Sequence, residues 1–209
     1  RMTVAEAAFP SLPDQQLGAN EESGLIAEGI AVNSTATLDL SDAAHPSVLG
    51  NPTEGALLLW LHSQSRDYRT LREGSKTLVE LPFATERKYM AAVVESGVLD
   101  GRRGLYVKGA PEIVRSLCAK AVGDESSETL NERLLGYQRQ AMRTLGFAYQ
   151  VLEGDEQAID DERGVVANDL TYLGTVAISD PVRPDVPEAV GECLSAGIDV
   201  KIVTGDTSA

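Results

Sequence analysis

Two short apolar segments joined by a tight-turn signal place the strongest limit on the fold of this chain. Residues 89–96 and 104–108 are predominantly apolar, and Asp100 and Gly101 lie between them. An aspartate–glycine pair readily adopts the left-handed backbone of a hairpin turn, so we expect the two segments to pair as antiparallel strands. The sheet should contain further strands, because strand-like runs recur at 77–81, 147–152 and 171–178.

Helical patterns lie between these strands. Residues 56–62 are apolar on every side and follow Thr53, whose hydroxyl can cap a helix, so we expect a buried helix. Pro111 suits the first turn of another helix, and apolar residues at helical spacing over 130–145 predict a third. Residues 28–40 are compatible with a strand or a short helix. The sequence predicts an α/β (α+β) fold in which helices flank a mainly antiparallel sheet.

The pattern changes towards the end of the chain. A proline-bracketed link over 180–184 precedes a helical pattern over 185–196 and an apolar run at 200–203. Strand, helix and strand in this order are typical of a crossover unit in a parallel sheet. We therefore expect one domain over residues 1–179, followed by a hinge and part of a second domain over residues 180–209.

Charge and the length of apolar runs exclude several classes of function. The net charge of −14 argues against a nucleic-acid partner, which requires a basic surface. The longest purely apolar run, 56–61, is far shorter than the ~20 residues of a membrane-spanning helix, so we expect a soluble chain without direct membrane contact. Cys118 and Cys193 lack metal-ligand spacing, and we expect buried thiols in a reducing compartment and no metal site. Because the chain begins at Arg1, we interpret it as a fragment of a longer protein.

Several local strings contain groups that suit a phosphate-bearing ligand, although each also has an ordinary structural explanation. Glu54, in the first turn of a helix, can simply oppose the helix dipole. Phe83, close to the basic pair at 87–88, can stack on a purine or belong to the core. Lys108 and the glycine after it can approach phosphate or form a common strand-to-helix turn. A turn and a helix cap would equally explain the strings at 180–184 and 204–206.

Taken together, the order and spacing of these strings are informative. The chain contains N-P-T-E-G-A-L, F-x-x-x-R-K-x-M, K-G-A-P-E, D-P-x-R-P and V-T-G-D in succession. In this arrangement it resembles the P-type ATPases, in particular their calcium-pump-like branch, over essentially its whole length. K-G-A-P-E together with F-x-x-x-R-K-x-M is highly specific, whereas D-P-x-R or T-G-D alone is not. The resemblance implies the nucleotide-binding domain of an ATP-driven cation pump, with calcium as the transported ion.

The resemblance also implies roles for individual residues. Glu54 would accept a hydrogen bond from the adenine amino group, and Phe83 would stack on the ring. The rest of the nucleotide site would comprise Lys88 and Lys108 beside the adenine and phosphates, Gly109 and Ala110 as the floor, Arg143 on the phosphates and Leu145 as an apolar contact. Residues nearer the transferring phosphoryl group and its magnesium would be Asp180 and Arg183 at the hinge, with Thr204, Gly205 and Asp206 beyond it.

The chain departs from the family pattern in ways that limit its chemistry. Thr85 stands where animal calcium pumps carry an arginine, so one phosphate contact would be missing. The sequence also lacks the phosphorylated aspartate of D-K-T-G-T and the later G-D-G-x-N-D segment. Phosphoryl transfer requires the nucleophile, metal and positioned cations together, so we expect this fragment to bind ATP or ADP without turnover. Mg²⁺ and the phosphorylation, actuator and transmembrane domains of the same polypeptide would complete the pump, of which this chain would be a cytosolic domain.

Three other interpretations are compatible with parts of the sequence. A soluble phosphohydrolase of the haloacid-dehalogenase (HAD) type would share V-T-G-D and the crossover unit, although the D-x-D-x-T-like nucleophile motif is missing. A regulatory module could use its acidic surface to bind a basic protein. A heavy-metal-transporting P-type ATPase is suggested by His45 and Pro46, but those pumps lack K-G-A-P-E.

Overall fold

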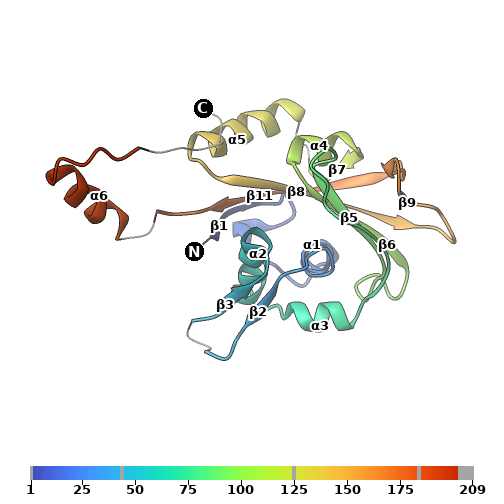
Figure 1. Cartoon of the computed structure of the whole chain (residues 1–209). Coiled ribbons are helices and arrows are strands. Elements are labelled where there is room, and N and C mark those ends of the chain that lie inside the picture. The colour runs from blue at the N-terminus through green and yellow to red at the C-terminus, as the bar shows by residue number, and fades with distance from the viewer. Residues whose placement is uncertain (1, 43–44, 124–125, 183–184, 202–209) are drawn as a thin grey trace.

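A computed structural model describes residues 2–42, 45–123, 126–182 and 185–201. Within these residues the central sheet has seven strands in the order β1-β11-β8-β6-β5-β4, with β7 also paired to β11 (Figure 1). All neighbouring strands are antiparallel except β7 and β11, so the predicted antiparallel sheet is confirmed. The strands are β1 Thr3–Ala8, β4 Lys76–Leu81, β5 Tyr89–Glu95, β6 Arg103–Gly109, β7 Cys118–Ala121, β8 Arg143–Leu152 and β11 Leu170–Ser179.

The predicted hairpin forms the β5–β6 pair. Tyr89 lies opposite Gly109, and the register continues without a shift to Glu95 opposite Arg103. Asp100 and Gly101 in the connection have φ angles of 53° and 82°. These are left-handed values that glycine and aspartate tolerate better than most residues, which explains why this dipeptide marks the turn.

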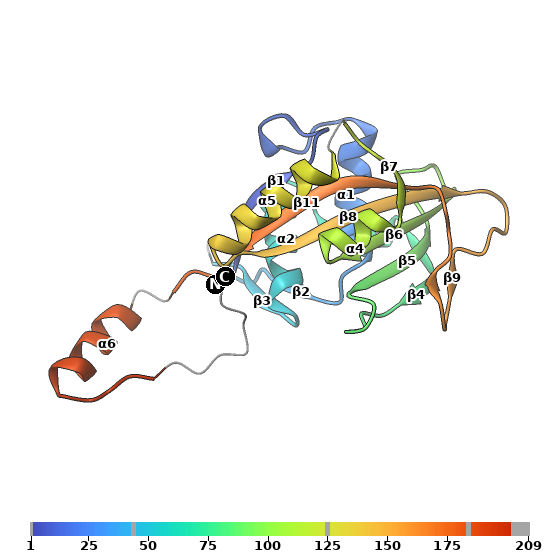
Figure 2. The ribbon, with the colours of Figure 1, turned by 90° about the horizontal axis from the view of Figure 1, so that it is seen from above.

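Helices cover both faces of the sheet (Figures 1 and 2). One face packs against α1 (Glu21–Val32) and α2 (Pro52–Ser63), with α3 (Tyr68–Glu73) beside α1. The other face packs against α4 (Pro111–Ser116) and α5 (Ser127–Arg139). Smaller elements are the 3₁₀ turn Pro13–Gln15 and the two-stranded pairs β2 (Thr37–Asp39) with β3 (Ser47–Leu49), and β9 (Ile159–Asp160) with β10 (Gly164–Val165).

The alternation of side chains along β8 shows how one strand supports two cores. Phe147 packs with α1 and α2, whereas its neighbour Ala148 packs with the α4 and α5 side. Successive residues of a strand point to opposite faces, so a strand buried on both sides reads as a nearly continuous apolar run.

The structure corrects the helix predicted over residues 130–145. Helix α5 ends at Arg139, the backbone turns at Ala141 with a φ of 53°, and β8 begins at Arg143. Residues 143–152 pair with β6 and β11 on either side, and these hydrogen bonds override the local helical spacing. As a consequence, Arg143 and Leu145 lie on a strand at the centre of the sheet.

Other local predictions need smaller corrections. Residues 28–40 contain the second half of α1 and the short strand β2, so neither alternative describes the whole segment. Helix α2 is capped by Asn51 instead of Thr53, because Pro52 occupies its first turn. Cys118 and Cys193 are half-buried rather than fully buried.

Helix α6 (Val186–Ser195) lies apart from the sheet in both views (Figures 1 and 2). The helix has no buried residue, although its sequence is amphipathic. Of the strand predicted at 200–203, residues 200 and 201 are not in a strand and the rest lies outside the described residues. Among the residues described, no helix is both long and apolar enough to cross a membrane.

Candidate functional site

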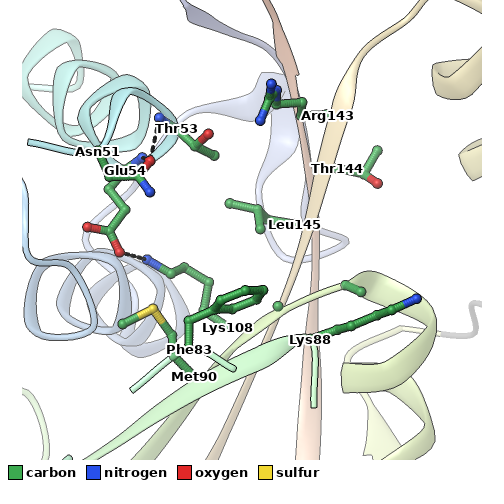
Figure 3. A pocket seen from close by; sticks show the side chains of 12 residues that line it. Asn51, Thr53, Glu54, Phe83, Lys88, Met90, Lys108, Arg143, Thr144 and Leu145 are labelled. Atoms are coloured by element: carbon green, nitrogen blue, oxygen red, sulfur yellow. Dashed lines mark hydrogen bonds and ion pairs between the residues drawn. The ribbon is translucent and has the colours of Figure 1, made fainter. Parts of the chain in front are cut away.

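All eight residues assigned to a nucleotide site from the sequence line one cavity of about 510 Å³ (Figure 3). The cavity lies between the start of α2, the turn that follows β4, the end of β6 and the start of β8. Its volume falls within the roughly 300–1,000 Å³ typical of small-molecule sites. These eight lining residues are Glu54, Phe83, Lys88, Lys108, Gly109, Ala110, Arg143 and Leu145.

A buried ion pair occupies one end of the cavity. The Lys108 Nζ lies 3.0 Å from Oε1 of Glu54, and their side chains are only 4% and 9% exposed. The ammonium also donates to the Asn33 carbonyl and, over 3.2 Å, to the Ser34 hydroxyl. Because an ammonium has three donor positions, these three acceptors satisfy Lys108 completely.

The second carboxylate oxygen of Glu54 is held by the segment that follows α1. Oε2 accepts hydrogen bonds from the Thr35 N–H at 2.8 Å, the Thr35 hydroxyl at 2.9 Å and the Ala36 N–H at 3.1 Å. Two backbone N–H groups, one hydroxyl and one ammonium therefore fix the orientation of this carboxylate.

Burial and charge act in opposite directions on this pair. Burial raises the pKa of the Glu54 carboxyl, but the charge of Lys108 and the hydrogen bonds from Lys108 and Thr35 together outweigh it, so the pKa lies below its ordinary value. Burial lowers the pKa of Lys108, and the opposing attraction of Glu54 does not fully offset it. We infer that Glu54 is ionised at neutral pH and presents only acceptors to a ligand.

Local sequence explains why Glu54 lies in this position. Asn51 accepts hydrogen bonds from the N–H groups of Thr53 at 2.9 Å and Glu54 at 3.4 Å, which starts α2 one residue later at Pro52. The next residue, Gly55, packs against Val48 of β3 so closely that an added Cβ would lie 2.1 Å from the valine. The N-P-T-E-G string thus caps the helix and brings its first turn against β3.

The turn between β4 and β5 supplies an exposed aromatic ring. Phe83 is 59% exposed, and in Figure 3 its ring appears below Leu145 and to the right of the Lys108 side chain. The turn closes through a hydrogen bond from the Lys88 N–H to the Ala84 carbonyl at 2.7 Å. An exposed phenylalanine that faces a cavity is available to stack on a flat ligand.

A close backbone contact joins this turn to the floor of the cavity. Lys88 adopts a left-handed φ of 58°, and its carbonyl accepts a hydrogen bond from the Ala110 N–H at 2.9 Å. A Cβ on Gly109 would lie 2.4 Å from the same carbonyl, which only glycine avoids. In Figure 3 the Lys88 side chain points away from the Glu54–Lys108 pair.

Arg143 marks the opposite end of the cavity from Lys108 (Figure 3). It is exposed at the start of β8, two residues before the half-buried Leu145. The cavity thus has an acceptor and a satisfied ammonium at one end, an aromatic and aliphatic middle, and unburied cations at its rim. This arrangement suits a flat heterocycle with an amino group and an anionic tail.

Several contributors to the site were missed or lie elsewhere. Asn51, Thr53, Met90 and Thr144 also line the cavity; the first three belong to the quoted motif strings, and Thr144 lies between Arg143 and Leu145. The segment 33–36 gave no recognisable signal, because it acts mainly through backbone groups. Among the other residues predicted from the sequence, Asp180 is exposed just after β11, and Arg183, Thr204, Gly205 and Asp206 lie outside the described residues.

The described residues contain no cluster of three or more histidine, cysteine, aspartate or glutamate side chains that could hold a metal ion.

Comparison with known proteins identifies the family of the chain. The family model described as P-type ATPase, cytoplasmic domain N, matches residues 23–185. The chain is 33% identical to calcium-transporting ATPase PAT1 of Dictyostelium discoideum, over 87% of this chain and 16% of the relative. It is 32% identical to plasma membrane-type calcium-transporting ATPase 5 of Oryza sativa subsp. japonica, over 99% of this chain and 21% of the relative. A third relative, plasma membrane calcium-transporting ATPase 2 of Oreochromis mossambicus, is 28% identical over 98% of this chain and 20% of its own length.

Proposed function

Because this chain belongs to the P-type ATPases and corresponds to their cytoplasmic domain N, we propose that it binds ATP in the cavity between α2, β6 and β8. The single observation that carries this proposal is the convergence on one cavity of Phe83, Lys108 and Arg143, which are up to 60 positions apart in the sequence. Stacking, an oriented acceptor and rim cations would match the ring, the amino group and the phosphates of an adenine nucleotide.

The base would occupy the end of the cavity near Phe83. Glu54 Oε1 accepts from Lys108, and its remaining lone pair would accept from the adenine amino group. A guanine placed in the same orientation would instead present its O6 carbonyl oxygen to this carboxylate, which is unfavourable for two acceptors. Phe83 would stack on the ring, and Leu145 would close the apolar side, with Gly109 and Ala110 as the floor.

The phosphates would extend towards the rim cations Lys88 and Arg143. Lys108 contributes differently, because its three donor positions are already occupied by Asn33, Ser34 and Glu54. We assign Lys108 to the base end, where it orients Glu54, and the exposed cations to the phosphate end. This assignment differs from the sequence-based expectation that Lys108 also steers the phosphates.

The role in a longer protein follows from the relatives, of which this chain spans only 16–21% of the length. We propose that residues 1–179 form the nucleotide-binding domain, and that residues 180–209 form the hinge and part of the phosphorylation domain. The domain would present ATP, with Mg²⁺ on its phosphates, to an aspartate in another segment of the same polypeptide. Calcium is the proposed transported ion, because the relatives are calcium-transporting ATPases.

The hinge side of the proposal concerns different residues. Asp180 and Arg183 would connect the two domains, and Thr204, Gly205 and Asp206 would face the phosphoryl group and its magnesium. We expect no turnover by the 209-residue chain, because the nucleophilic aspartate is missing from its sequence.

Isothermal titration of ATP tests the proposed site. Phe83→Ala should weaken binding by about 5- to 150-fold, because a base–aromatic stack contributes roughly 1–3 kcal/mol. Leu78→Ala is a matched control, since Leu78 is an exposed apolar residue on the adjacent strand β4 and does not line the cavity. Equal ATP affinity in wild type and Phe83→Ala would refute the site. Turnover of a phosphate ester by the purified chain would instead support a soluble phosphohydrolase.

A further inference from the structure

Arg72 lies outside the nucleotide cavity but holds the segment on which the Glu54–Lys108 pair depends. Its Nε donates to the Ala31 carbonyl at 2.8 Å, and its Nη2 donates to the carbonyls of Ser34 at 2.7 Å and Ala36 at 3.0 Å. A guanidinium has five donors in a fixed plane, so one side chain can connect three carbonyls that an ammonium could not hold in the same geometry.

The same segment uses its other polar groups to hold the ion pair. The N–H groups of Thr35 and Ala36 donate to Glu54, whereas the Asn33 carbonyl and the Ser34 hydroxyl accept from Lys108. Residues 33–36 therefore form a bridge between the guanidinium and the buried pair. Movement of this bridge would change the direction in which the Glu54 carboxylate points.

Arg72 is itself held in place by its neighbours on α3. Its guanidinium carbon lies 4.8 Å from the centroid of the Tyr68 ring, and the Tyr68 hydroxyl accepts a hydrogen bond from the Leu38 N–H at 3.0 Å. Asp67 caps the start of this helix through the Arg69 N–H at 2.9 Å. The short helix α3, which carries none of the recognised motifs, thus fixes both ends of the segment between α1 and β2.

We propose that Arg72 is a positioning residue for adenine recognition: through residues 31–36 it fixes the orientation of Glu54, and with it the preference for ATP over GTP. This inference rests on the proposed nucleotide site. Arg72 does not line the cavity, so its effect should be confined to the end of the ligand that Glu54 contacts. Binding of the phosphates by Lys88 and Arg143 should not depend on it.

Titration of ATP and of GTP into the wild type, Arg72→Lys and Arg72→Gln tests the proposal. Both variants should bind ATP about tenfold more weakly, because neither side chain can hold all three carbonyls in the same geometry, and losing one hydrogen bond from a charged donor has an effect of this order. GTP binding should change by less than about twofold, so the ATP/GTP affinity ratio should fall about tenfold. A residue with only a structural role would weaken both nucleotides together.

Arg69→Gln is the matched control. Arg69 lies on the same helix and stacks on the same Tyr68 ring at 5.8 Å. Within the described parts of the chain its side chain hydrogen-bonds Asp67 and no carbonyl of residues 31–36, so its substitution should leave the affinity ratio unchanged. Amide NMR spectra give a readout that does not require nucleotide. The Thr35 and Ala36 amide signals should shift in Arg72→Lys, which retains the charge and the helix propensity, but not in Arg69→Gln.

The outcomes separate this inference from the proposed function. If wild type binds ATP but Arg72→Lys retains the wild-type ATP/GTP ratio, the positioning role is wrong and the nucleotide site stands. If the wild type binds no ATP, the nucleotide site is wrong and the inference falls with it, even where the amide signals of Thr35 and Ala36 shift as expected. If Arg72→Gln fails to fold, the ATP/GTP affinity ratio of Arg72→Lys alone tests the positioning role.

Discussion

Replacing Lys108 by methionine would remove the ammonium from a side chain that is 4% exposed while leaving an apolar stem of similar length. Glu54 would then remain buried with only the neutral donors of Thr35 and Ala36. Removing one partner of a buried ion pair typically costs about 3–5 kcal/mol, because the other charge is left uncompensated. At about 2–4 °C per kcal/mol for a chain of this size, the melting temperature should fall by roughly 6–20 °C.

A second substitution separates the loss of attraction from the cost of the remaining charge. Glu54→Gln in the Lys108→Met background removes the buried carboxylate but retains a side-chain carbonyl that can accept from Thr35 and Ala36. The double variant should therefore be more stable than Lys108→Met by about 1–3 kcal/mol. Lys120→Met is the control, because the Lys120–Asp169 pair is 62% and 57% exposed and should contribute at most about 1 kcal/mol.

The pH dependence of stability checks independently whether the uncompensated charge of Glu54 causes the loss of stability in Lys108→Met. In the wild type the folded-state pKa of Glu54 is lowered, so its stabilising contribution is present above the unfolded-state pKa and is lost as pH falls through the folded-state value. In Lys108→Met the main causes of the lowering are removed, and burial should raise the pKa of Glu54 instead. The difference in the free energy of unfolding between the wild type and Lys108→Met should be largest near pH 7 and should shrink towards pH 4.

Urea unfolding at pH 7 and at pH 4 measures these differences. The transition is monitored by the fluorescence of Trp60 and by far-UV circular dichroism. Trp60 is the single tryptophan, lies on α2 and stacks on the buried Phe9, so its signal reports the packing of this helix on the core. A loss below about 1 kcal/mol at pH 7, the range of exposed pairs, would show that the pair is not effectively buried. A deficit that does not change with pH would show that the uncompensated carboxylate is not its cause.

Two further predictions concern the cavity floor and the cysteines. Gly109→Ala should lower the free energy of unfolding by about 1–3 kcal/mol, because the added Cβ would lie 2.4 Å from the Lys88 carbonyl. Gly136→Ala on α5 is the control, because a Cβ there has open space and should not be destabilising. Equal melting temperatures for the two variants in thermal unfolding would contradict the steric argument. Cys118 should resist alkylation by iodoacetamide at pH 8, because burial raises the pKa of its thiol to about 12. Cys193, on the exposed helix α6, should be alkylated first. Mass spectrometry of the native and the urea-unfolded chain would show whether the difference between the two thiols depends on the fold.

Local sequence patterns were sufficient where the chain's own turn and cap chemistry decides the structure. Asp100 and Gly101 predicted the β5–β6 hairpin because the turn requires left-handed backbone angles. The start of α4 at Pro111 follows from the fixed φ angle of proline. Patterns failed at 130–145, where an apolar spacing compatible with a helix is interrupted at Ala141 and continues as strand β8. Pairing with β6 and β11 decided that segment, and local propensity cannot represent partners from distant parts of the chain.

The sequence by itself determined which residue types are available for the proposed nucleotide site, because the order of the motif strings is specific even without coordinates. Only the tertiary structure decided how they are used. The ammonium of Lys108 is occupied by Asn33, Ser34 and Glu54, which separates it from the rim cations Lys88 and Arg143. The physical reason is that residues 31–36 act through backbone N–H and carbonyl groups, which every residue possesses and which therefore leave no trace in a sequence pattern. Their role, and that of Arg72 behind them, arises only when the fold brings them beside α2 and β6.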